Sequence, residues 1–375
     1  MNTRFHAALA SVVLVLAGTT ALAAPPSSRP DQDLSAWERP CVDLIKNFDD
    51  MYQPCVVATP GDPAGYGYKM WFFGWAVTDC NKDKGTSGCD AIFHARSKDL
   101  VRWEIYAGPS GWDTTMNPKL WVPVITADNK PYDDWHNGDP SVVFHDGRFH
   151  MALSATGSEN RVKFHPNNML LCVMGATSVD GIHWTKTDQP LLIEPPEARN
   201  PTTAKGWTGD FHRPSLMWDQ GKWRLWFDYW NPGHGLCMGY AENTGKFDAP
   251  GGFKVLHAGR DPLLEEWPNP EVVKVGNRYH SFSDPSDPKR KYDYRLYPMR
   301  SRAICEAVSD DGLNWKVVGF IQPEADAYAT HVPQAFVTKA DGKTWLYLFY
   351  ATQRGGETNY DYRYDRIRAM RREIR

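Results

Sequence analysis

The chain has 375 residues, a formal net charge of −3 at pH 7 and no block of basic residues. This balance gives no support for nucleic acid or an acidic membrane surface as a partner. The aromatic content is 13%, a composition typical of exported proteins that handle carbohydrate.

The chain begins MNTRFHAALASVVLVLAGTTALAAPP, in which a polar start with Arg4 precedes an apolar run and the small-residue site Ala21-Leu22-Ala23. This order is typical of a cleavable signal peptide. No later stretch approaches about 18 consecutive apolar residues, so no further membrane span is expected. We expect residues 1–23 to be a signal peptide, 24–48 an N-terminal extension and 49–375 the catalytic domain. The product is then secreted or periplasmic, with no membrane attachment after cleavage.

Seven cysteines leave at least one outside an intramolecular disulfide. Cys172 and Cys237 stand in apolar runs, where we expect small buried side chains. In an oxidising compartment two disulfides are expected. The candidate pairs are Cys80 with Cys89, around the polar loop NKDKGTSG, and Cys41 with Cys55.

One unit occurs five times along the chain: a short apolar strand that starts at a residue followed by proline. The five starts are QPCVV at 53–57, DPSVV at 139–143, RPSLM at 213–217, NPEVV at 269–273 and VPQAF at 332–336. Proline is acceptable at the start of a strand because that position need not donate to the ladder.

A tight turn and an aromatic strand follow four of these starts, as in HDGRFHMALSA and ADGKTWLYLFYA. Such turns between alternating apolar segments indicate β-hairpins. Third strands end in a Ser-Asp turn and a tryptophan: ARSKDLVRW, ATSVDGIHW and AVSDDGLNW. A repeat of three or four strands is typical of a propeller blade. The sequence therefore predicts an all-β fold, a five-bladed β-propeller.

In a propeller the first strand of each blade lies next to the central axis, so its first residues face one mouth of the channel. The second strand ends at the same mouth. Polar and aromatic residues that converge on a concavity are a default ligand site. The candidates at this mouth are Gln53, Trp75, Trp135, Asp139, Trp207, Asp210, His212, Arg213, Trp230, Trp267, Asn269, Glu271 and His331.

With these units in view, the sequence resembles the five-bladed superfamily that includes the arabinanases and xylosidases of family 43, the fructosidases of family 32 and the anhydrogalactosidases of family 117. GDPSVVFHDGRFHM and the recurring A-x-S-x-DG-x-x-W ends carry the resemblance, which covers all five units. In families 43 and 32 it implies an Asp base or nucleophile in the first blade, an orienting Asp in the second and a Glu acid in the third. Only the second position matches, at Asp139. Gln53 holds the first position and His212 the third, where a histidine acid is similar to family 117.

Glycosidic hydrolysis needs a proton donor and a base or nucleophile on opposite sides of the bond. Our catalytic candidates are Asp139, Asp210, Glu271 and His212. Each has a structural alternative: a strand or loop cap for the two Asp residues, an inter-blade contact for Glu271, and a buried structural histidine for His212. Our substrate-binding candidates are Gln53, Trp75, Trp135, Trp207, Arg213, Trp230, Asn269 and His331.

Arg213 would bind substrate or neutralise Asp139. Glycosidic hydrolysis by such residues requires no cofactor. A calcium ion at the axis of the propeller, near the histidines, is a second expectation that the sequence permits.

The sequence thus favours an exported glycosidase that acts on a polysaccharide or its oligosaccharides. A carbohydrate-binding, lectin-like propeller without catalysis is the alternative, because the first-blade Asp is missing. A sialidase is disfavoured, because the Ser178-Val179-Asp180-Gly181 turn lacks a residue of the sialidase pattern. A phosphorylase would need a phosphate site, for which 289–295 is a weak candidate.

Overall fold

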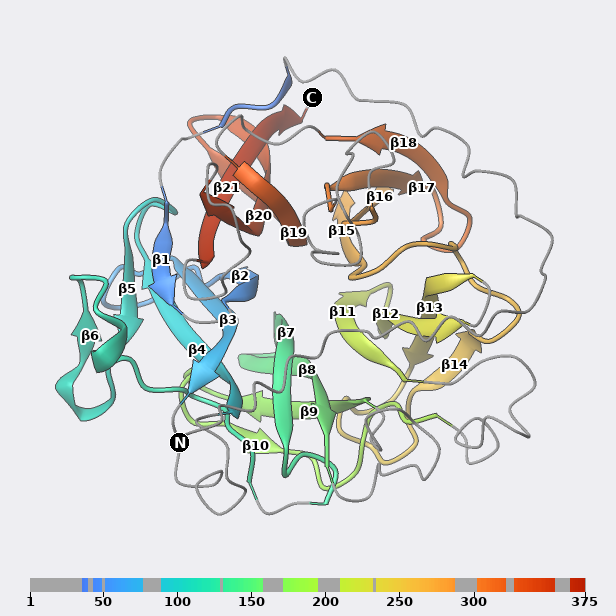
Figure 1. The fold of residues 1–375 in the computed structure, drawn as a ribbon, viewed down its shortest axis with the longest axis horizontal. Helices are drawn as coiled ribbons and strands as arrows, with labels where there is room; N and C mark the ends of the chain where they lie inside the picture. The colour runs from blue at the N-terminus through green and yellow to red at the C-terminus, as the bar shows by residue number, and fades with distance from the viewer. Residues whose placement is uncertain are drawn as a thin grey trace, which may run out of the picture.

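The computed structural model describes residues 36–39, 43–48, 51–76, 89–128, 131–157, 171–194, 210–231, 234–286, 302–321, 327–354 and 365–374. They form five antiparallel sheets around one axis, as Figure 1 shows. The predicted five-bladed β-propeller is therefore confirmed. Strands β2, β7, β11, β15 and β19 surround the centre, and each blade continues outward from its innermost strand.

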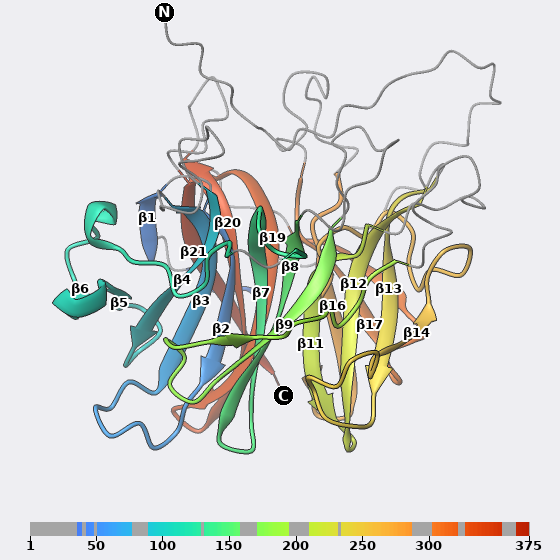
Figure 2. The ribbon, with the colours of Figure 1, turned by 90° about the horizontal axis from the view of Figure 1, so that it is seen from below.

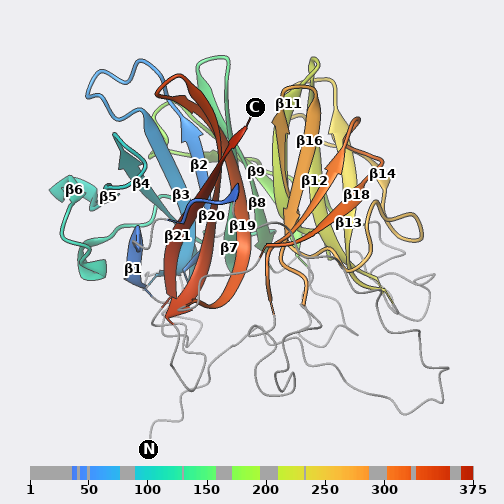
Figure 3. The same cartoon turned by 90° about the horizontal axis from the view of Figure 1, so that it is seen from above.

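The first two blades, each from the axis outward, consist of β2 (Tyr52–Ala58), β3 (Tyr68–Ala76), β4 (Cys89–Ser97), β5 (Trp103–Tyr106) and β6 (Trp112–Asp113), and of β7 (His136–His145), β8 (Arg148–Thr156), β9 (Cys172–Ser178) and β10 (Thr185–Lys186). The next two consist of β11 (His212–Asp219), β12 (Lys222–Asn231), β13 (Gly235–Asn243) and β14 (Lys254–His257), and of β15 (Glu271–Val275), β16 (Arg278–Ser283), β17 (Cys305–Ser309) and β18 (Lys316–Phe320). Side views show that the hairpin turns β2–β3 and β7–β8 lie at the same face (Figures 2 and 3).

Both ends of the chain build the fifth blade. It consists of β19 (Ala327–Ala340), β20 (Lys343–Arg354), β21 (Asp365–Ile374) and β1 (Ile45–Phe48), with β1 antiparallel to β21. Glu38 also forms a bridge with Arg371. The propeller is thus closed by a strand that precedes residue 49, the boundary expected from the repeat.

The residue before the repeated proline has a left-handed backbone in every blade. The φ angles are 46° at Gln53, 51° at Asp139, 47° at Arg213, 50° at Asn269 and 47° at Val332. Positive φ is unfavourable for residues other than glycine. In four of the blades the pairing between the innermost strand and the second strand shifts register at this residue and the proline after it. The shift marks a β-bulge. The repeated x-Pro therefore sets a local geometry at the start of each innermost strand.

The residue after each proline links its blade to the next one. Cys55 Sγ accepts from the Val142 amide, Ser141 Oγ from Leu216, Ser215 Oγ from Val272, Glu271 from Ala335, and Gln334 Oε1 from Val56. These five contacts form a closed ring of hydrogen bonds around the axis. The ring explains why the strand starts carry a small or polar residue after proline.

The Ser-Asp turns at the ends of the third strands are also structural. Ser178 Oγ accepts from the Gly181 amide at 2.9 Å, and Ser309 Oγ accepts from Gly312 at the same distance. A tryptophan of the preceding blade then donates to the turn carbonyl: Trp226 Nε1 lies 2.9 Å from Gly312 O. Separate apolar cores fill the spaces between neighbouring blades.

Cys55 is a buried free thiol, so the expected disulfide between Cys41 and Cys55 is wrong. The physical reason is that Cys55 Sγ occupies a position in the inter-blade ring, 3.1 Å from the Val142 amide nitrogen. Cys172 and Cys237 are buried side chains in strands β9 and β13, as expected. The pair Cys80 and Cys89 lies partly outside the described residues. Within the described part of the chain, no helix has the length and apolar character that a membrane span requires.

Candidate functional site

The pre-proline residues bring polar side chains together at the axis. Gln53, Asp139 and Asn269 are buried, and Arg213 keeps about a fifth of its side chain exposed, at 22%. Arg213 lies between two carboxylates: its Nε is 4.0 Å from Asp139 Oδ1 and its NH1 is 3.7 Å from Asp228 Oδ2. Arg213 and Asp139, which the sequence analysis paired, therefore form a long ion pair. The same guanidinium also forms an ion pair with Asp228.

Side chains at the end of the second strand of a blade accept hydrogen bonds from backbone amides at the start of the innermost strand of the next blade. Ser154 Oγ accepts from the Arg213 amide at 2.7 Å, Asp228 Oδ2 from Asn269 at 2.9 Å, and Asp284 Oδ2 from Val332 at 2.8 Å. Each acceptor is a buried side chain. Asp228 and Asp284 were not among the sequence candidates, although WFDYW and FSD place an Asp at the same position after their turns.

Asp228 also orients His212. The Nδ1 atom of His212 contacts Asp228 Oδ1, and both side chains are buried. An ionised carboxylate only accepts hydrogen bonds, so Nδ1 carries the proton. Burial, followed by the charges of Arg213, His136 and Arg302, lowers the pKa of His212 well below its ordinary value. A neutral His212 in this tautomer has a free lone pair on Nε2, which suits a proton acceptor.

A second histidine–carboxylate pair lies in the same region. His136 Nδ1 is 2.5 Å from Asp90 Oδ2, and the imidazole is buried. Burial opposes the charged form, but Asp90 and then Asp139 raise the pKa of His136 above its ordinary value. Sequence reasoning passed over this pair because 46 residues separate its members; the only signal was His136 itself, in WHNGDP.

His331 is buried on the fifth blade, 6.4 Å from Tyr52 between ring centroids. Burial, then Arg302 and Arg213, lower its pKa to about 3, so the ring is neutral. Among the described residues no three His, Cys, Asp or Glu side chains are arranged to hold a metal ion. The chemistry proposed for the axial residues uses no metal ion.

Several buried polar atoms around the axis have no hydrogen-bond partner among the described residues. They are Gln53 Oε1, His136 Nε2, Asp139 Oδ1, Arg213 Nε and Asn269 Oδ1. Buried polar groups are almost always satisfied, so a cluster of exceptions indicates a place for water or a ligand. The five atoms include donors and acceptors, which is the complement that a sugar with several hydroxyls requires.

Two of the four catalytic candidates, Asp210 and Glu271, form hydrogen bonds within the fold. Asp210 Oδ1 accepts from the Leu171 amide at 2.7 Å, which ties the start of β11 to the segment before β9. Glu271 belongs to the inter-blade ring: it accepts from the Ser215 hydroxyl at 3.1 Å and also bonds Gln334. The left-handed backbone of Asn269, φ 50°, precedes Pro270, and the side chain that follows them contacts the two neighbouring blades.

We expect Glu271→Gln to make stability less dependent on pH. Burial raises the pKa of Glu271 from 4.5 to about 8, so the folded state keeps a proton that the unfolded chain loses. The contribution of this carboxyl group to the free energy of unfolding is largest below pH 4.5 and is lost as the pH rises from 4.5 to about 8. A neutral amide of the same shape keeps the ring bonds and does not titrate. The difference in unfolding free energy between Glu271→Gln and wild type should therefore grow in favour of the variant by roughly 2–4 kcal/mol from pH 5 to pH 8.

Urea unfolding of both proteins across this pH range measures the difference. A constant difference in unfolding free energy would show that Glu271 is ionised in the folded state.

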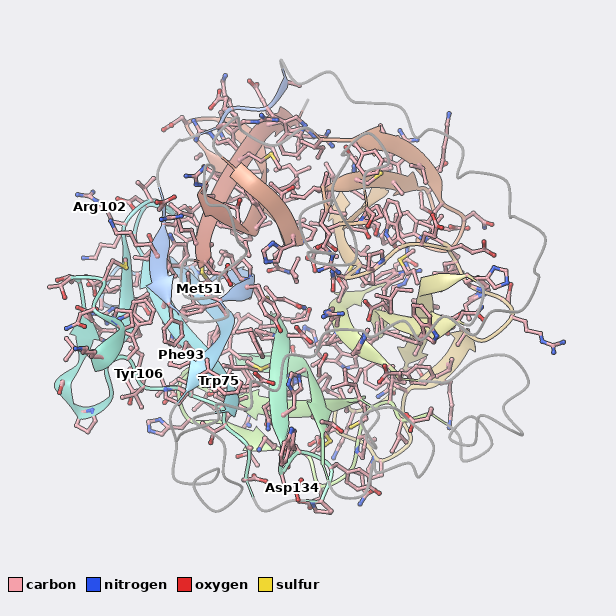
Figure 4. All side chains as sticks on the ribbon, in the orientation of Figure 1. Met51, Trp75, Phe93, Arg102, Tyr106 and Asp134 are labelled. Atoms are coloured by element: carbon pink, nitrogen blue, oxygen red, sulfur yellow. The ribbon has the colours of Figure 1, made fainter. Side chains whose placement is uncertain are left out.

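The aromatic candidates are divided by the structure. Trp230, at the end of β12, is 40% exposed, whereas Trp75 and Trp135 are half-buried. Figure 4 places Trp75 on the side of the first blade that faces the second. Trp267 is fully buried and donates to Ser281 Oγ at 3.0 Å, so it belongs to the core. Trp207 lies outside the described residues.

No protein-family model matches the sequence, and no curated protein matches it significantly. Solved structures do share its fold. A glycoside hydrolase superposes with a TM-score of 0.55 at 17% identity, over 88% of this chain and 89% of that chain. A thermostable family-43 glycoside hydrolase gives 0.55 at 14% identity, over 88% and 91%. The Bombyx mori family-32 β-fructofuranosidase gives 0.53 at 13% identity, over 88% of this chain and 63% of that one. The chain therefore has the five-bladed β-propeller fold that glycoside hydrolases of families 43 and 32 share.

Proposed function

We propose that the protein is an exported glycoside hydrolase that cleaves a polysaccharide or its oligosaccharides at the axial mouth. The observation that carries the proposal is the cluster at the strand starts. Asp139, Arg213 and the His212–Asp228 pair meet there, next to buried polar atoms that no described residue satisfies. The fold, which glycoside hydrolases of families 43 and 32 share, supports hydrolysis of a glycosidic bond as the reaction class. The cluster supplies the ionisable groups that this reaction needs.

In this proposal His212 removes a proton from the attacking water. Asp228 holds Nδ1–H, so Nε2 is the acceptor and the charge that forms on the ring is balanced by the carboxylate. Gln53 occupies the position at which the resemblance implies a carboxylate, and it is buried with φ 46°. The resemblance implies an acid at the position of His212, but its lowered pKa favours a neutral ring. In this proposal His212 is therefore the base and takes the role of the missing first-blade Asp. Asp139, beside Arg213, orients the sugar or stabilises charge at the reacting centre.

The same Gln53 favours a second candidate, a carbohydrate-binding propeller without catalysis. A neutral amide at this position binds hydroxyl groups but neither activates water nor attacks a sugar.

One experiment separates the two candidates. The purified protein that starts at Ala24 is incubated with arabinan, xylan, fructan, agar-derived and mannan oligosaccharides, beside Asp139→Asn. We expect product release by the wild type and little by the variant. Saturable binding without products in both proteins would establish the binding propeller. Amino-terminal sequencing of the exported protein tests cleavage after Ala23.

A further inference from the structure

The His136–Asp90 pair has no role in the function proposed so far, although it lies at the same strand starts. His136 begins β7, three residues before Asp139. Its Nδ1 donates to Asp90 on β4, at 2.5 Å. Its Nε2 is buried and has no hydrogen-bond partner among the described residues.

Packing fixes the ring beside Asp139. A Cβ atom at Gly138 would lie 3.1 Å from His136 Cε1 and 2.5 Å from the Phe73 ring, so only glycine fits between them. The rings of Phe73 and His136 are 5.8 Å apart between centroids. Cε1 lies between the two ring nitrogens, so this edge of the imidazole faces Gly138, and the charge of Asp139, the next residue, acts on the ring.

We propose that His136 is the proton donor of the reaction: its Nε2–H protonates the glycosidic oxygen, while His212 takes a proton from the attacking water. This inference rests on the proposed function.

The step balances. Water adds to the anomeric carbon as the bond to the leaving oxygen breaks, the leaving oxygen receives the His136 proton, and the water proton goes to His212. Exchange with solvent then restores both rings.

The charges around His136 suit a donor. Asp90 faces it from β4, Asp139 from its own strand, and Arg213 and His212 from β11; Phe73 on β3 is apolar. The two carboxylates outweigh burial and Arg213 and raise the pKa of His136, whereas the surroundings of His212 lower its pKa. Two groups of the same type are thus driven to opposite protonation states, the arrangement that acid–base pairs require.

The test compares leaving groups. His136→Gln is assayed on the panel oligosaccharide that the wild type cleaves and on the 2,4-dinitrophenyl glycoside of the sugar released. Dinitrophenolate leaves without protonation, so only the oligosaccharide needs an acid. We expect kcat/KM to fall at least about a hundredfold on the oligosaccharide and less than about fivefold on the dinitrophenyl glycoside. Equal losses on both substrates, or an unchanged rate on the oligosaccharide, would overturn the proposal.

The chain offers a matched control in His183, whose Nδ1 lies 2.7 Å from Asp180 on an exposed turn. His183→Gln removes the same type of pair away from the axis and should leave both rates unchanged. If His136→Gln does not fold, Asp90→Asn is used, because it removes the orienting carboxylate and should show the same leaving-group dependence to a smaller extent.

Wild-type pH profiles give a readout that needs no variant. The alkaline fall in kcat/KM should be present for the oligosaccharide and absent for the dinitrophenyl glycoside; a fall with both substrates would also overturn the proposal. Absence of products from every panel member would instead refute the proposed function itself.

Discussion

Asp139→Asn is expected to lower kcat/KM by at least about a hundredfold while the melting temperature stays within a few degrees of wild type. A group that stabilises charge at the reacting centre contributes about 10²–10³ in rate. The carboxylate lies 4.0 Å from the Arg213 guanidinium, and its Oδ1 has no hydrogen-bond partner among the described residues. Asparagine has the same shape and tolerates positive φ, so the backbone at φ 51° is kept.

Asp146→Asn is the matched control. Asp146 also has a left-handed backbone, φ 50°, but lies in the exposed turn between β7 and β8 with a side chain 86% exposed. It should leave both rate and stability unchanged. Initial rates and thermal unfolding of the three proteins test the prediction, and unchanged turnover in Asp139→Asn would remove Asp139 from the mechanism.

The position of Asp139 was predictable because the repeat is local. The x-Pro start, the hairpin turn and the Ser-Asp turn each lie within a few residues, and local backbone chemistry determines each of them. Aligning the five starts therefore identified the blades and the residues that begin the innermost strands. The same alignment of the second strands would have found Asp228 and Asp284, which stand at equivalent positions after their turns.

Contacts between blades were not predictable in the same way. His136 and Asp90 come from different blades, and the closing strand β1 pairs with β21 from the far end of the chain. Glu271 shows the same limit: period-two alternation places it on the channel side, but the left-handed backbone of Asn269 before it breaks the alternation. Its partners, Ser215 and Gln334, belong to two other blades. Such partners follow from how the blades pack, which one sequence does not specify.

Asp228 has two separable roles, and this makes its replacement informative. Its Oδ2 accepts from the Asn269 amide at 2.9 Å, which is a structural role, and its Oδ1 holds His212. Asp284 has the first role without the second: its Oδ2 accepts from the Val332 amide at 2.8 Å, and its Oδ1 accepts from the Asn269 side chain. The pair Asp228→Asn and Asp284→Asn therefore separates support of the next blade from orientation of a histidine.

We expect Asp228→Asn to lower kcat about 10²–10⁴-fold, and Asp284→Asn to lower it less than about tenfold. An amide at 228 donates to Nδ1 of His212, which moves the ring proton to Nε2 and removes the base. Both variants should lose a similar amount of stability, since each weakens the bond to the next strand start. Steady-state kinetics and urea unfolding of both variants provide the comparison. Equal losses of kcat would mean that Asp228 acts only through the backbone of the fourth blade, and His212 would then lose its role as the base.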